Sequence, residues 1–298
     1  METSTTATTS TTTGHLLPSG TTLGATRLVV TNLERSIEWY RRTIGLAAVA
    51  RDGNVAQLAA QDGRVVIELE EHPDARPAGR HSGLYHVALL YPTRVELSHQ
   101  LRRIAAAGAP VQGLSDHHTH EAIYLPDPDG NGLELAADRP RDQWPPNDTD
   151  PFKLGIAPID VDSLLAETDT GTDTPELANG VVTGHLHLHV GNIDEAVAFW
   201  RDVVGFEPQV LLDVAGFVSV DGYHHHLAFN TWKGEGAAPV PENVTGMAHW
   251  TLLLPDAAGI DALESRLSAA GTQHARRDDG TLVLRDPWNM ELHVAARD

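Results

Sequence analysis

Three histidines alternate with leucines at positions 185 to 189 of the chain. In a β-strand successive side chains point to opposite faces, so His185, His187 and His189 would share one face, and Leu186 and Leu188 the other. Leucines on one face can pack against helices, whereas a row of imidazoles is costly to bury without polar partners. The pattern therefore predicts a strand whose histidines line a polar, concave side of a sheet.

Two further residues suggest that this polar side holds a metal ion. His249 opens another predicted strand, and Glu291 follows the Asp286-Pro287 turn on the last strand of the chain. Two neutral imidazoles and one carboxylate on adjoining strands form a facial triad that leaves coordination positions open, as in non-haem Fe(II) oxygenases. We therefore expect Fe(II) at His185, His249 and Glu291, although Mn(II) or Zn(II) would also suit these ligands.

A second group of histidines occupies residues 224–226, on the predicted last strand of the same module. By alternation His225 faces opposite to His224 and His226, so only one subset reaches the polar side. A histidine near a metal can move protons at neutral pH, as the ring opening of a diol requires. The alternative is a His-rich edge exposed to water.

An internal repeat identifies the elements that must position these residues. Residues 30–45 align without a gap with residues 190–205, at an offset of 160. Each copy reads as a strand, an Asn turn and an amphipathic helix that ends at Gly45 or Gly205. A βα unit is therefore used twice.

A second unit repeats at an offset of 163. His86 and His249 each begin a strand that leads into a helix, and each copy then ends in two strands joined by an Asp-Pro turn. The chain thus divides into four βαβββ modules, near residues 24–72, 82–139, 183–232 and 246–295. We expect an α+β fold with a disordered tail at residues 1–22. Two domains of two modules each follow, at residues 23–140 and 181–298, joined by an acidic linker at residues 141–180.

Composition narrows the classes of function. The 41 acidic residues outnumber the 21 basic ones, which disfavours nucleic acid as a partner. The chain has no cysteine, so a thiolate metal site and a disulfide framework are excluded. It also lacks both the long apolar run of a membrane helix and the features of a signal peptide. We expect a cytoplasmic homo-oligomer that acts on small molecules.

The paired modules, with His185 and His249 opening two equivalent strands and Glu291 on a closing strand, resemble the two-domain extradiol catechol dioxygenases of the vicinal oxygen chelate superfamily. The resemblance covers residues 24–139 and 183–295. It implies Fe(II) in the C-terminal domain, with a catechol-type aromatic substrate and O2 binding beside it. Residues 225–229 (His-His-Leu-Ala-Phe) match a family motif whose histidine acts as acid and base, so the resemblance assigns that role to His225, with His224 and Asn230 as neighbours.

One position departs from the family pattern. A Tyr often precedes the last Asp-Pro turn by three residues, and here that position holds Val283. His187 and His189, which we expect to contact substrate together with Tyr223 and Trp250, are also polar for a site that binds a plain biphenyl-type ring. A hydroxylated phenol or a hydroquinone is therefore a candidate substrate beside catechols.

The N-terminal domain resembles a glyoxalase I at three of that relative's four metal positions, namely Glu68, His86 and Glu134. The fourth falls on Ala25. The incomplete set suggests a vestigial site. Two alternatives to the dioxygenase remain, a glyoxalase-type isomerase or lyase, which would need four protein ligands, and a metal-free protein that sequesters a small molecule.

Overall fold

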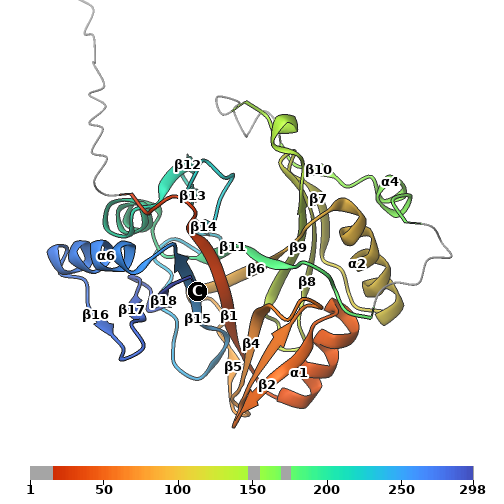
Figure 1. Cartoon of the computed structure of the whole chain (residues 1–298), viewed down its shortest axis with the longest axis horizontal. Helices are drawn as coiled ribbons and strands as arrows, with labels where there is room; N and C mark the ends of the chain where they lie inside the picture. Colours follow the sequence, from red (N-terminus) through yellow and green to blue (C-terminus); the bar gives the residue numbers. More distant parts are fainter. Residues whose placement is uncertain (1–15, 147–154, 169–175, 298) are drawn as a thin grey trace, which may run out of the picture.

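The computed structural model describes residues 16–146, 155–168 and 176–297. Its elements follow the four predicted modules in order (Figure 1). The first module comprises β1 (Thr22–Val30), α1 (Leu33–Trp39), the π-helical turn η1 (Tyr40–Ile44), β2 (Ala47–Asp52), β3 (Val55–Ala59) and β4 (Val65–Glu71). The second comprises β6 (Gly83–Tyr91), α2 (Arg94–Ala107), β7 (Gly113–Asp116), β8 (His120–Pro126) and β9 (Gly132–Asp138).

The second half of the chain repeats this order. The third module comprises β11 (Val182–His189), α5 (Ile193–Val197), η3 (Ala198–Val204), β12 (Glu207–Leu212), β13 (Ala215–Ser219) and β14 (Leu227–Asn230). The fourth comprises β15 (Val244–Leu254), α6 (Ala257–Ala269), β16 (His274–Arg276), β17 (Leu282–Arg285) and β18 (Glu291–Ala296). Short connecting elements are β5 (Arg76–Pro77), η2 (Arg141–Gln143), β10 (Ala157–Pro158) and α4 (Val161–Leu165).

The predicted helix boundaries in the first and third modules are confirmed. Asn32 and Asn192 cap the two helices, each accepting a hydrogen bond from the backbone N–H three residues later, at 2.9 Å. Gly45 and Gly205 end the helical segments with φ angles of 80° and 102°, which glycine adopts without steric cost. The repeated sequence therefore encodes repeated local structure.

The modules combine into sheets across the two halves of the chain, and this differs from the expected grouping. One sheet has the order β16-β17-β18-β15-β1-β4-β3-β2 and joins the first module to the fourth. The other has the order β10-β7-β8-β9-β6-β11-β14-β13-β12 and joins the second module to the third. All four modules carry the same strand pattern, so either grouping satisfies their hydrophobic alternation, and the pattern alone cannot select between them.

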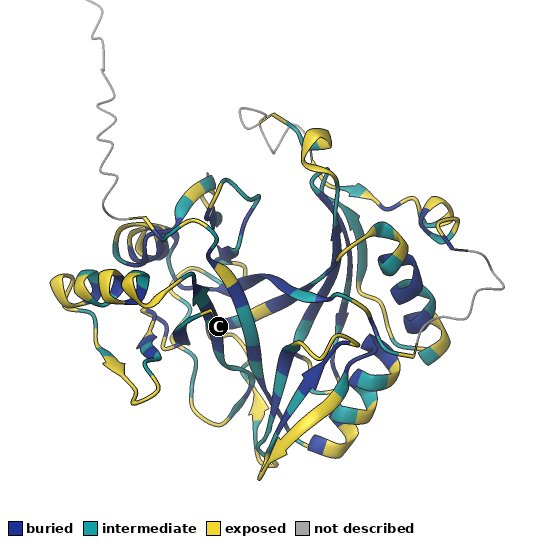
Figure 2. Ribbon diagram, viewed as in Figure 1, coloured by how far each residue is buried: buried dark blue, intermediate teal, exposed yellow. Residues whose placement is uncertain are grey.

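The helices lie against the sheets and bury one side each, as the dark and yellow faces of α2 and α6 show (Figure 2). Leu186 and Leu188, predicted to face helices, are fully buried in the apolar core. The last residues of the expected tail also belong to the fold, because Leu17 is buried and donates its N–H to the carbonyl of Gly205. Residues 1–15 lie outside the described part. In the expected linker, Leu164 of α4 is buried as well.

Candidate metal centre

The strand β6 lies between β9 and β11 and brings their side chains together. In its ladders Ala88 is paired with Glu134 of β9 on one side, and lies beside His185 of β11 on the other. His86 precedes Ala88 by two residues and therefore points to the same face. Because the Ala88 side chain is only a methyl group, His86, Glu134 and His185 can converge above it.

The three side chains meet within hydrogen-bonding distances. Nε2 of His86 lies 2.9 Å from Oε2 of Glu134, and Nε2 of His185 lies 3.2 Å from the same oxygen. All three residues are buried. Two imidazoles and one carboxylate form the ligand set of a facial triad. The described residues contain two further groups of this type, His120 with Asp138 and His224, and His249 with Glu291 and His293, but only in the cluster of His86, Glu134 and His185 are all three members buried, so it is the best candidate metal centre.

The unused polar atoms of this cluster fit a bound cation. Nδ1 of His86 is buried and makes no hydrogen bond with a described residue, and Oε2 of Glu134 faces two imidazole nitrogens at once, at 2.9 and 3.2 Å. Burial alone would raise the pKa of Glu134, but the neighbouring His185 and His86 hold that pKa well below its usual range. Glu134 is therefore an ionised carboxylate close to two imidazole nitrogens, and together these groups can bind a divalent metal ion.

The expected triad of His185, His249 and Glu291 is not assembled. His249 and Glu291 are on β15 and β18, in the sheet that does not contain His185. They converge instead with His293, whose ring stacks on that of His249 at 3.8 Å. The ligand types were predicted, but His86 and Glu134 supply the second imidazole and the carboxylate, because β6 and not β15 pairs with β11.

The sheet that contains β1 and β15 carries a different set of residues at the positions equivalent to those of the cluster. In the β8–β9 hairpin Glu134 is opposite Tyr124, and in the β17–β18 hairpin His293 is opposite Val283. Tyr124 and Val283 are equivalent, because each precedes an Asp-Pro turn by three residues. Their cross-strand partners are therefore equivalent too, and His293 occupies the position that Glu134 has in the other sheet. Ala25 takes the place of His185.

The expected vestigial set of Glu68, His86 and Glu134 is thus divided between the two sheets. Glu68 is held by Arg27 at 2.8 Å in the sheet of β1, while His86 and Glu134 belong to the candidate metal cluster. Glu291 is likewise paired, with His293 at 2.7 Å and with Arg285. Glu68 and Glu291, in the sheet that contains β1 and β15, are therefore each already paired with an arginine, and Glu291 also with a histidine.

A candidate acid and base lies next to the cluster. The His225 ring centroid is 4.1 Å from that of His185, and its Nδ1 is 2.8 Å from Nδ1 of His224. Nε2 of His224 in turn lies 3.1 Å from Oδ1 of Asp138. Burial and the neighbouring His185 hold the pKa of His225 well below its usual range, so the ring is neutral and can accept a proton.

Two further residues are in this site, namely His120, from the segment 116–120 that could compensate for the incomplete N-terminal set, and Tyr124, which was not predicted. The tyrosine sought at Val283 is present in the second module, three residues before Asp127, and this motif could have identified it. Its hydroxyl is 2.8 Å from Nε2 of His117, and burial and then Glu134 raise its pKa, so the phenol keeps its proton. Nε2 of His120 lies 3.2 Å from Oε1 of Glu134.

Polar residues form the neighbouring wall. The amide of Asn230 lies between two histidines, with Nδ2 at 2.8 Å from Nε2 of His187 and Oδ1 at 2.8 Å from Nδ1 of His189. The rings of Tyr85 and Trp232, both partly exposed, are 5.3 Å apart and pack near these histidines. This wall would offer both hydrogen bonds and aromatic contact to a small ring.

Two expected substrate contacts lie elsewhere. Trp250 is on β15 and is buried against Trp200, with ring centroids 5.7 Å apart, so it belongs to the core of the other sheet. The reason is again the strand pairing, which places β15 beside β1. The hydroxyl of Tyr223 donates to Oδ2 of Asp138 at 2.9 Å, behind His224. Tyr223 thus supports the histidine cluster from outside.

Comparison with known proteins defines the family. Residues 22–135 and 183–293 match the Glyoxalase family, described as the Glyoxalase/Bleomycin resistance protein/Dioxygenase superfamily. The chain is 39% identical over 273 residues to "Catechol-2,3-dioxygenase" of Bacillus subtilis, covering 90% of this chain and 94% of that protein. The chain therefore belongs to this superfamily, and the predicted vicinal oxygen chelate fold is confirmed.

Solved structures agree on the fold. A Bacillus subtilis protein described provisionally as a dioxygenase superposes with a TM-score of 0.64 at 12% identity, covering 92% of this chain and 84% of that one. Glyoxalase I from Zea mays superposes with a TM-score of 0.57 at 14% identity, covering 92% of each chain. At such low identity these likenesses concern the fold alone.

No helix in the described residues is long and apolar enough to cross a membrane.

Proposed function

We propose that this protein is an Fe(II)-dependent extradiol dioxygenase whose metal is held by His86, Glu134 and His185. The observation that carries the proposal is the buried set of two imidazoles and one carboxylate, whose nitrogen and oxygen atoms converge at 2.9 and 3.2 Å. Three protein ligands leave coordination positions open for substrate and O2. The 39% identity to a curated catechol-2,3-dioxygenase over most of both chains supports the same class of reaction.

The residues around the metal ligands have separate roles. When bound, the metal would supply adjoining positions for the two substrate oxygens and O2. His225, neutral and close to His185, takes the proton of a substrate hydroxyl and later returns it. Tyr124 keeps its phenolic proton and can donate a hydrogen bond to a substrate or product oxygen. His224 and Asp138 orient His225 from behind.

The wall of His187, His189 and Asn230 favours a hydroxylated ring. Asn230 Nδ2 donates to Nε2 of His187, which leaves the proton of that ring on Nδ1 as a free donor. A substrate with an additional polar group would satisfy it, while Tyr85 and Trp232 would contact the ring itself. We therefore propose a catechol-type or related hydroxylated aromatic substrate.

The two alternatives receive less support. A glyoxalase-type isomerase would need a fourth protein ligand, and the last strand of the third module, β14, has Ala228 where the first module has Glu68, at the repeat offset of 160. A metal-free binding protein would have no use for Glu134, a buried carboxylate that His86, His120 and His185 approach. The ligand set therefore favours redox chemistry with O2.

Metal content and oxygen uptake test the proposal together. Protein purified without oxygen should hold about one Fe per chain, and catechol, 4-methylcatechol or hydroquinone should each be tested for O2 consumption. A yellow, ring-opened product formed with stoichiometric O2 uptake would support the dioxygenase. Mn(II) with uptake would change only the metal, Zn without uptake would favour the isomerase, and neither metal nor uptake would favour the binding protein.

The oligomeric state stays a prediction. We propose a homo-oligomer, and light scattering on the purified chain measures it. A mass equal to one chain of 32.1 kDa would contradict this part of the proposal.

A further inference from the structure

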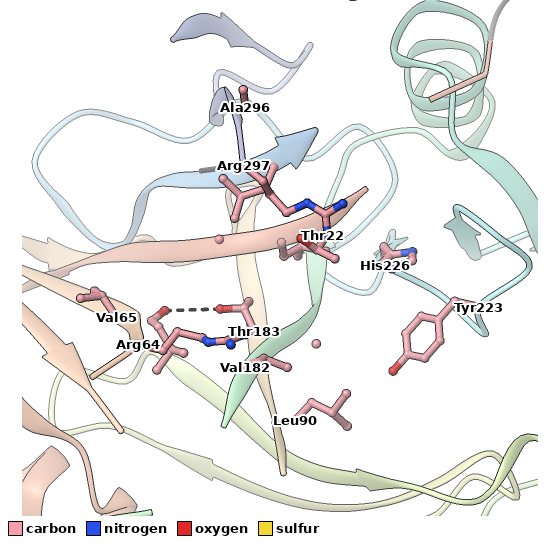
Figure 3. A pocket seen from close by; sticks show the side chains of 15 residues that line it. Thr22, Arg64, Val65, Leu90, Val182, Thr183, Tyr223, His226, Ala296 and Arg297 are labelled. Carbon is pink, nitrogen blue, oxygen red and sulfur yellow. Dashed lines mark hydrogen bonds between the residues drawn. The ribbon is translucent and has the colours of Figure 1, made fainter. Parts of the chain in front are cut away.

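A cavity of about 600 Å³ is lined by residues other than His86, Glu134 and His185 (Figure 3). It is lined by the starts of β1, β4 and β11, the ends of β6, β15 and β18, and the loop before β14. Its walls are related by the sequence repeat, because residues 22–24 and 182–184 differ by 160, and Leu90 and Leu253 by 163. The cavity therefore lies where the two halves of the chain meet.

The cavity and the metal centre use alternate residues of the same segments. His185 belongs to the metal cluster, whereas the preceding Gly184 lines the cavity. Similarly His225 packs on His185, while the following His226 lines the cavity. Gly184 and His185 are neighbours on β11, and because neighbouring side-chain positions of a strand point to opposite sides, β11 lies between the two sites.

The lining is positively charged in an otherwise acidic protein. Two arginines, Arg64 and Arg297, are among the fifteen lining residues, and none of those fifteen is acidic. The Arg297 guanidinium has no hydrogen bond or ion pair with a described residue. The only ion-pair partner of Arg64 in the described chain is Asp62, at 3.8 Å. With 41 acidic residues in the sequence, two weakly paired guanidinium groups at one cavity point to an anionic ligand.

The remaining walls show what kind of anion would fit. Leu90, Val182 and Leu253 contribute apolar surface, and Val65 and Val66 of β4 add to it. Thr22, Thr183, Tyr223 and His226 supply polar groups. His226 accepts the backbone N–H of Val220 at Nδ1, so its proton is on Nε2 and available for donation. An inorganic anion would leave the apolar walls without contacts, whereas an organic acid would use both kinds of surface.

We propose that this cavity is a second small-molecule site that binds an organic monocarboxylate with an apolar or aromatic body, its carboxylate held by one of the two exposed guanidinium groups, Arg64 or Arg297. Guanidinium groups bind carboxylates through paired, charge-assisted hydrogen bonds. The volume of the cavity lies within the usual range for small-molecule sites, roughly 300–1,000 Å³. The proposal does not depend on the reaction at the metal centre.

The surroundings of Tyr223 provide a measurement of binding that is separate from activity. Tyr223 lines the cavity, and its ring centroid is 5.7 Å from that of Trp144. A ligand that contacts Tyr223 would change the surroundings of this tryptophan. Titration of the metal-loaded protein with benzoate, followed by calorimetry and by tryptophan fluorescence, should therefore give one saturable site per chain.

Matched ligands and variants identify the site. Benzamide lacks the charge and acetate lacks the apolar body, so each should bind at least roughly tenfold more weakly than benzoate. The double substitution Arg64→Gln and Arg297→Gln should weaken benzoate at least about tenfold. Arg201→Gln, which changes an exposed arginine paired with Asp202 outside the cavity, should leave the affinity unchanged.

Three results would overturn the proposal. The first is equal benzoate affinity in wild type and in the double variant. The second is acetate binding as tightly as benzoate, which would show a simple anion site. The third is loss of benzoate binding in His86→Ala protein that circular dichroism shows to be folded, since benzoate would then occupy the metal centre. Retained binding in that variant supports the separate cavity.

Discussion

Nε2 of His185 lies 3.2 Å from Oε2 of Glu134, although His185 opens the second half of the chain and Glu134 closes the first. The contact exists because β11 and β9 flank the same strand, β6. The candidate metal centre is thus built jointly by the two halves of the chain. Neither half alone contains the three ligands.

The first prediction concerns which histidines hold the metal. His86→Ala, His185→Ala or Glu134→Ala should lower the metal content from about one ion per chain to a small fraction, because each removes one of three protein ligands. Turnover should fall with it. Metal analysis after extensive dialysis, together with O2 uptake, measures both quantities.

His249→Ala is the matched control for His86→Ala. The two histidines lie on equivalent strands at the repeat offset of 163, and the side chains of both are largely buried. The His249 variant should keep its metal and its activity. Metal loss in His249→Ala but not in His86→Ala would move the metal to the sheet that contains β15.

The second prediction separates proton transfer from metal binding. His225→Ala should keep the metal, because His225 packs beside His185 and is not one of the three ligands. Turnover should fall by roughly 10²- to 10⁴-fold, the usual contribution of a general acid and base. Steady-state O2 uptake and metal analysis of the same sample measure this.

Tyr124→Phe tests the second proton donor of the site. It keeps the ring and removes only the hydroxyl, so we expect a smaller loss of turnover with the metal retained. Full activity in both variants would remove His225 and Tyr124 from the mechanism.

Much of the local structure could be predicted from the repeat. The helix ends at Gly45 and Gly205 and the burial of Leu186 and Leu188 follow from local preferences and alternation. The partner of each strand could not be predicted, because four modules with one pattern offer equivalent edges. The sequence therefore predicted a cluster of two imidazoles and one carboxylate but named His249 and Glu291 where the structure has His86 and Glu134.

The same reasoning explains Tyr124 and Trp250. Tyr124 was missed because the motif was sought only in the fourth module, at Val283. Trp250 was expected to contact substrate, but it follows His249 on β15, and both residues lie in the other sheet. Both errors follow from one unknown, the choice of module pairs, and not from the interpretation of individual residues.

The third prediction concerns substrate selection. Asn230→Asp removes the N–H that donates to His187 and should reorganise the wall of His187 and His189. Since the wall is expected to bind the ring and not to transfer protons, KM should rise roughly tenfold while kcat changes little. Kinetics with catechol and 4-methylcatechol measure the two parameters.

Asn243→Asp serves as the control for Asn230→Asp, because Asn243 is an exposed residue just before β15. Its kinetics should match wild type. A loss in kcat with unchanged KM in Asn230→Asp would place Asn230 among the residues that act on the reaction itself.

The fourth prediction concerns stability and pH. Burial raises the pKa of Asp286 from 3.8 to about 7. Its Oδ1 accepts the N–H groups of Trp288 and Met290, both at 2.9 Å, while Oδ2 is buried without a hydrogen-bond partner in the described chain. Below pH 3.8 the carboxyl is protonated in the folded and unfolded chains alike, so it contributes no pH dependence there.

Between pH 3.8 and about 7 only the unfolded chain releases the proton of Asp286, so this residue lowers the free energy of unfolding as pH rises. The loss is complete above about pH 7 and is on the order of 4 kcal/mol at most. Asp286→Asn keeps the acceptor oxygen and removes the titration. We therefore expect the variant to gain stability over wild type at pH 8 and to lose that advantage near pH 4. Thermal or urea unfolding at both pH values measures the difference, with the exposed Asp213→Asn as control. Parallel stability curves for wild type and Asp286→Asn from pH 4 to pH 8 would show that Asp286 is ionised in the folded protein and that its turn solvates the charge.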